Sequence, residues 1–159
     1  MTSNERTELI ERYRAGAAAV AEATAGISDA ELDHRPAGDG EWTAREIIHH
    51  LADSESMAYI RLRRLIAEDD PQIQGYDEPE WARRLHYDRP IDPSLGVLTA
   101  VRGASLQLLE SLTEAEWART GTHTESGPYS VEGWLSIYAA HPREHADQIR
   151  RARASAAAG

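Results

Sequence analysis

The sequence predicts an all-α fold, a four-helix bundle with one long crossover connection. Four long segments place apolar residues at the three- and four-residue spacing of a helix that buries one face. No segment shows the convincing alternation of apolar and polar residues that a half-buried strand would show. About 20 residues separate the second long segment from the third, enough to cross the bundle and allow an order other than simple up and down. We found no repeat and no linker, so residues 1–159 are expected to form a single domain.

The first helix is expected over about residues 5–25. Apolar positions recur along it at helical spacing, at Leu9, Ile10, Tyr13, Ala17, Val20 and Ala21. Gly26 follows and ends the helix. Ser28 and Glu31 then form a capping-box pattern, which predicts a further turn or two of helix.

The second helix is expected to begin after a break in the chain. Pro36 and the glycine-rich stretch 38–40 interrupt regular structure. Thr43 and Glu46 repeat the capping-box pattern, so the helix should open at Thr43 and continue to about Glu68.

The third long helix is expected after the crossover. Asp77 should cap a short helix that carries Trp81 and Leu85. Asp92 followed by Pro93 resembles an N-cap and a first helical residue, and the helix should then run to about residue 112.

The fourth long helix closes the sequence. Thr113 and Glu116 predict one more short turn, and residues 121–129 are expected to form a loop. Ser130 should cap the fourth helix, which reaches about residue 153 before a frayed tail.

Composition excludes several kinds of chemistry. All 17 basic residues are arginine, and the chain has 27 acidic residues. The resulting net charge of -10 argues against a nucleic-acid partner. A chain without lysine cannot form a lysine Schiff base, and one without cysteine has no thiolate nucleophile or disulfide. The charged N-terminal stretch lacks the apolar core of a signal peptide, and no stretch is apolar enough for a membrane helix. A cytoplasmic protein with a small-molecule substrate and no membrane partner is expected.

Two neighbouring histidines on the second helix differ in helical phase. A helix turns about 100° per residue, so His50 lies about 60° from Ile47, at the edge of the apolar stripe. His49 lies about 160° away and is expected to face solvent or a partner. His50 is therefore the candidate metal ligand on this helix.

The fourth helix carries a second pair of histidines. Its inward face is expected to contain Trp134, Tyr138, His141, His145, Gln148 and Ile149. The four-residue spacing places His141 and His145 side by side, where both can bind one metal ion. Together with His50 they predict a mononuclear three-histidine site. Each histidine could instead be an ordinary hydrogen-bonded core residue.

Two well-known metal motifs do not fit. A zinc protease needs glutamate directly after the first histidine, and Pro142 stands there. A di-iron bundle needs two Glu-x-x-His units, and only Glu46 with His49 makes one. Pro142 also removes a backbone donor within the fourth helix, so a kink between the two histidines is expected.

The chain resembles the DinB/YfiT-like superfamily of helical metalloenzymes. The resemblance is carried by residues 41–55, by Gly121-Thr122-His123 and by residues 130–149, and extends over nearly the whole chain. It implies a four-helix bundle of unusual order, often a homodimer. It also implies a divalent metal, zinc first and nickel next, held by the residues that match His50, His141 and His145.

Three protein nitrogens leave a position open, as in catalytic rather than structural metal sites. The resemblance implies an S-transferase that uses a low-molecular-weight thiol, and we rank this activity first. The alternatives are a hydrolase that uses metal-bound hydroxide and a non-catalytic metal-binding stress protein. Four further residues are candidates for the pocket or for support of the ligands: Trp42, Asp53, His123 and Tyr138.

Overall fold

The computed structural model describes residues 1–38 and 41–158. Its elements follow in the order α1 (Ser3–Thr24), α2 (Asp29–Asp33), α3 (Ala44–Ala67), β1 (Gln72–Ile73), α4 (Glu78–Arg84), α5 (Asp92–Ser111), α6 (Glu114–Trp117), β2 (Thr120–His123), β3 (Gly127–Ser130) and α7 (Val131–Ala158). Within the described ranges, no helix is long and apolar enough to cross a membrane.

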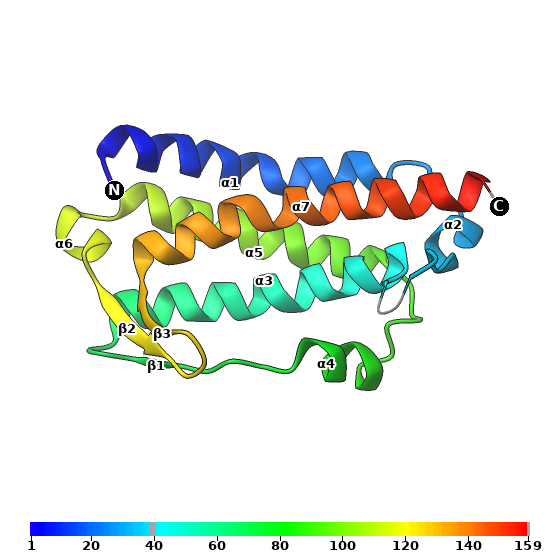
Figure 1. Cartoon of the computed structure of the whole chain (residues 1–159). Helices are drawn as coiled ribbons and strands as arrows, with labels where there is room; N and C mark the ends of the chain where they lie inside the picture. Colours follow the sequence, from blue (N-terminus) through cyan, green and yellow to red (C-terminus); the bar gives the residue numbers. More distant parts are fainter. Residues whose placement is uncertain (39–40, 159) are drawn as a thin grey trace.

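The four long helices α1, α3, α5 and α7 form the bundle. Helices α1 and α7 run in one direction and α3 and α5 in the other (Figure 1). Helix α1 packs on α5 and α7, and α3 packs on the same two helices. Neighbours α3 and α5 are thus parallel, which requires the chain to return along the bundle through β1 and α4 (Figure 1). The predicted four-helix bundle with a long crossover is confirmed.

The helices begin mostly where their capping patterns predict. Side-chain oxygens accept backbone N–H bonds at four predicted N-caps: Ser28, Thr43, Asp77 and Thr113. Ser130 likewise accepts from the N–H of Gly133 at 3.0 Å, at the start of α7. Each such cap stabilises a helix start by about 1 kcal/mol, because it satisfies an otherwise unpaired donor.

The start of α5 and the end of α7 differ from the sequence prediction, and the break at 38–40 is described only at its first residue. The N-cap of α5 is Ile91, without a side-chain cap bond, and Asp92 is the first helical residue, where its charge still favours the helix dipole. The predicted frayed tail is helical to Ala158, because the side chains of Arg153 and Ser155 bond to α2 and its flanks. In the predicted break at 38–40, Gly38 has a φ of 138°, and the other two residues lie outside the described residues.

The predicted loop at 121–129 is a hairpin. Strands β2 and β3 pair antiparallel, with His123 opposite Gly127, and β1 adds a parallel edge beside β2. Strands of two to four residues are too short to show a two-residue alternation, which is why the sequence pattern missed them. Gly121 fits because any side chain there would meet the carbonyl oxygen of Pro71, 2.6 Å from an added Cβ.

A buried arginine contacts all four long helices. The Arg102 guanidinium of α5 pairs with Glu55 of α3 at 2.6 Å, and both side chains are at most 3% exposed. The same group donates to the carbonyl oxygen of Tyr138 on α7, at 3.2 Å, and to that of Tyr13 on α1. It also lies 3.7 Å from the centre of the Tyr13 ring. We call Arg102 and Glu55 the central ion pair.

Replacing Gly16 by alanine is expected to destabilise the protein by about 1–3 kcal/mol, although alanine favours helices. An added Cβ would lie 2.6 Å from Arg102 Nη2, and the bonds to three helices prevent this guanidinium from moving aside. Gly103→Ala in α5 is the matched control, since nothing lies within 4 Å of its added Cβ. That change should stabilise by about 0.5–1 kcal/mol. Urea unfolding of both variants checks this; equal and stabilising effects would contradict it.

Candidate metal centre

The structure brings His50, His141 and His145 together. His50 comes from α3, and His141 and His145 lie one turn apart on α7. One nitrogen from each ring lies within 4.8 Å of the other two. The centre of the His50 ring lies 5.5 Å from the ring centre of His141 and 4.9 Å from that of His145. Pro142 lies within a continuous helix, and the pair stays on one face, with its two Nε2 atoms 3.1 Å apart.

Neighbouring side chains set where the protons of the α7 pair lie. The side-chain oxygen of Gln148 can only accept, so His145 donates to it through Nδ1, at 2.9 Å. Nδ1 of His141 lies 3.9 Å from Glu55 Oε1, too far for a hydrogen bond, and has no hydrogen-bond partner in the described residues. A carboxylate attracts a proton at that nitrogen. Both rings are therefore disposed to keep Nε2 unprotonated.

Burial favours the neutral form of two of the three imidazoles. It lowers the pKa of His50 to about 3, with further lowering by His145 and His141. It also lowers the pKa of His145 to about 4, again with a contribution from His141. Neutral imidazole is the form that binds metal, so these rings are ready to do so at neutral pH.

The arrangement fits a divalent cation. Two unprotonated nitrogens 3.1 Å apart bring their lone pairs face to face, which is unfavourable unless a proton or a metal ion lies between them. The third imidazole, His50, converges on the same point and is 2% exposed. Three nitrogen donors without a thiolate or carboxylate suit zinc and its neighbours in the first transition row.

The outward orientation predicted for His49 is wrong. Its side chain is fully buried, and its ring nitrogens hydrogen-bond to the hydroxyl of Ser94 at 2.8 Å and to the carbonyl of Arg89 at 2.9 Å. The crossover and the start of α5 cover this face of α3, which helical phase alone does not reveal. Since both nitrogens are used, His49 has a structural role.

A different carboxylate from the predicted one lies near the site. Asp53 accepts a 2.7 Å hydrogen bond from the hydroxyl of Tyr87 rather than from an imidazole. Glu55, two residues on, is the acid beside His141. The sequence held a signal for this, because a step of about 100° puts Glu55 about 80° from Ile47 and Asp53 about 120° away.

The other three candidates lie around the centre. The edge of Trp42 packs on His50, with ring centres 5.0 Å apart. Tyr138 is buried, and its ring centre lies 6.0 Å from that of His141. His123 lies on β2 and lines a cavity of about 230 Å³ together with His141 and Tyr138. Trp42 and Tyr138 thus wall the centre, and His123 belongs to the cavity beside it.

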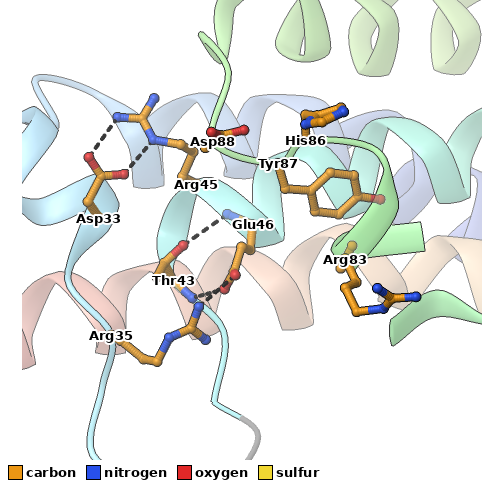
Figure 2. Close-up of a pocket in the computed structure, with 10 residues that line it drawn as sticks. Asp33, Arg35, Thr43, Arg45, Glu46, Arg83, His86, Tyr87 and Asp88 are labelled. Carbon is orange, nitrogen blue, oxygen red and sulfur yellow. Dashed lines mark hydrogen bonds and ion pairs between the residues drawn. The ribbon is translucent and has the colours of Figure 1, made fainter. Parts of the chain in front are cut away.

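A second groove lies at the start of α3, and none of the three histidines lines it. Its volume is about 470 Å³, and Figure 2 shows its charged side chains. Most of these charges are already compensated: Arg45 binds Asp33, and Arg35 binds Glu46, which also caps α3 through Thr43 (Figure 2). Because these ion pairs and hydrogen bonds hold the start of α3 in place, they account for the charged residues of the groove. The groove is therefore not our candidate site.

Comparison with known proteins identifies relatives. Residues 12–149 match the family model described as the DinB superfamily. A candidate metal-dependent hydrolase of Oceanobacillus iheyensis is 44% identical over 110 residues, which make up 69% of this chain and 64% of that protein. The chain therefore spans just under two thirds of the length of this relative. A candidate metal-dependent hydrolase of Bacillus mycoides is 34% identical over 134 residues, 84% of this chain and 77% of that protein.

A solved structure shows the same architecture. YfiT from Bacillus subtilis, described as a candidate metal-dependent hydrolase with an unusual four-helix bundle topology, superposes with a TM-score of 0.88. The superposition covers 96% of this chain and 87% of that one, at 28% identity. The parallel neighbours α3 and α5 are therefore a topology shared with a solved relative.

Proposed function

Because the chain belongs to the DinB superfamily, we propose that it is a metal-dependent hydrolase that holds its metal with His50, His141 and His145. The observation that carries this proposal is the convergence of three imidazoles, with one nitrogen of each within 4.8 Å of the other two. The names of the relatives support hydrolysis and metal dependence. Zinc is our first choice of metal and nickel the second, since both suit three nitrogen donors.

The chain's own residues would prepare this chemistry. A bound divalent ion with an open position supplies a Lewis acid that lowers the pKa of a bound water to about 7. Gln148 holds the Nδ1 proton of His145, and Glu55 favours a proton on Nδ1 of His141, so the Nε2 atoms of both rings would be available to hold the metal. Trp42 and Tyr138 cover the histidines and limit the access of bulk water.

Hydrolysis replaces thiol transfer as our first choice. The resemblance favoured a thiol S-transferase, but the comparisons do not support that activity, and the relatives are described as candidate hydrolases. A requirement for a small thiol is therefore one outcome of the test below. The homodimer and the absence of nucleic-acid binding remain predictions.

The zinc-loaded protein is expected to hydrolyse an activated ester, p-nitrophenyl acetate, faster than the metal-free protein and without any thiol. Release of nitrophenolate measures the rate, before and after dialysis against EDTA and after return of zinc. The His86→Asn variant, which removes an exposed histidine, corrects for zinc bound at the surface. A rate that depends on an added thiol would favour transfer, and turnover that ignores the metal would overturn the proposal.

A further inference from the structure

A cavity of about 230 Å³ lies beside His141, and neither Trp42 nor His50 lines it. It is enclosed by α3, the crossover, the hairpin and α7, through residues that include Ser54, Arg61, Tyr76, His123 and Tyr138. We call it the His141 cavity. Liquid water takes about 30 Å³ per molecule, so the space corresponds to about eight waters, or one small organic group.

Arg61 brings to this cavity a positive charge that forms no ion pair within the described residues. Its guanidinium donates to the hydroxyl of Tyr138 at 3.0 Å and to the carbonyl of Gln74 at 2.8 Å, both of them neutral groups. Among the described residues, no carboxylate oxygen lies within 4.0 Å of Arg61, and its buried Nε has no hydrogen-bond partner. Arg64, less than one turn further along α3, is paired with Glu68.

Two further donors point to the same kind of ligand. The hydroxyl of Tyr76 is buried without a partner in the described residues, and burial raises its pKa, so it keeps its proton. His123 is 9% exposed, and its Nδ1 accepts the backbone N–H of Glu125 at 3.2 Å. Burial lowers the pKa of His123, so the ring is neutral and carries its proton on Nε2.

We propose that the His141 cavity binds a carboxylate of the substrate, with Arg61 supplying the charge and Tyr76 and His123 supplying hydrogen bonds. The role in catalysis rests on the proposed function, because the ligand would lie next to His141. The substrates would be small acyl compounds that carry a free carboxylate near the bond to be cut. Glu78, which is exposed and also lines the cavity, disfavours a doubly charged phosphate.

Calorimetric titration with benzoate and with neutral benzamide tests this proposal. The two probes have nearly the same shape, so a charge-selective cavity should bind benzoate at least about tenfold more tightly. Arg61→Gln keeps a donor near Tyr138 but removes the charge, and should lose most of this preference. Arg64→Gln is the matched control on the same helix and should keep it. Thermal melting of both variants verifies that they fold.

Repeating the titration after metal removal tests the cavity independently of the candidate metal centre. The preference for benzoate should survive dialysis against EDTA, because Arg61, Tyr76 and His123 are not metal ligands in our proposal. Loss of the preference on metal removal, or an unchanged preference in Arg61→Gln, would overturn the carboxylate site. A preference that persists in a protein unable to bind zinc would support the cavity while the proposed function fails. Zinc-dependent hydrolysis without any preference for benzoate would support the proposed function and overturn the carboxylate site.

Discussion

Replacing Arg102 by methionine is expected to lower the free energy of unfolding by about 3–5 kcal/mol. Methionine fills similar space but leaves the carboxylate of Glu55 buried without its partner, in a position with no exposed surface. The bonds to the carbonyls of Tyr13 and Tyr138 are lost as well. Urea unfolding at neutral pH, followed by circular dichroism, measures the effect.

Two controls separate burial of charge from loss of an ion pair in general. Combining Arg102→Met with Glu55→Gln removes both charges and should recover a large part of the stability. Arg150→Met breaks a pair with Asp147 in which both side chains are about half exposed, and should cost less than about 1 kcal/mol. Equal effects of Arg102→Met and Arg150→Met would contradict the assigned role of the central ion pair.

Replacing His145 by alanine is expected to weaken zinc binding by more than about 100-fold, because it removes one of three donors and leaves a two-nitrogen site. Gln148→Leu should have a smaller effect, about 10-fold to 100-fold, since it removes only the group that orients His145. Competition with a chromogenic chelator measures each affinity.

The exposed histidine provides the reference for this series. His86→Asn lies outside the three-histidine group and should bind zinc like the parent protein. Asparagine also tolerates the positive φ of 53° at this position. If His145→Ala and His86→Asn bind zinc equally well, the three histidines are not its ligands.

The sequence predicts the helices well because their signals are local. A cap at Thr43 or Ser130 needs only the next three residues, and a buried face shows in the spacing of one segment. The hairpin was missed because its stability comes from pairing between β2 and β3 and from the close approach of Gly121 to Pro71. Such contacts between distant residues leave no pattern within one short strand.

The residues around the candidate site were likewise predicted only in part from the sequence. Helical phase was enough to predict that His50, His141 and His145 come together, because each lies toward the inside of the bundle on a long helix. It misplaced His49, since the element that covers this residue comes about 40 positions later in the chain. Arg61 and Tyr76 gained significance only when the crossover and the hairpin enclosed the His141 cavity.

The participation of α7 has a consequence for how the protein is made. Helix α7 follows α1, α3 and α5 in the chain, and it supplies His141 and His145 to the candidate metal centre and the carbonyl of Tyr138 to the central ion pair. It also packs along α1, which precedes the other three long helices in the chain. A nascent chain from which only α1, α3 and α5 have emerged therefore exposes a partial apolar core. We expect it to need protection from aggregation until α7 emerges. Folding and completion of the candidate metal centre would then occur together, once α7 has emerged.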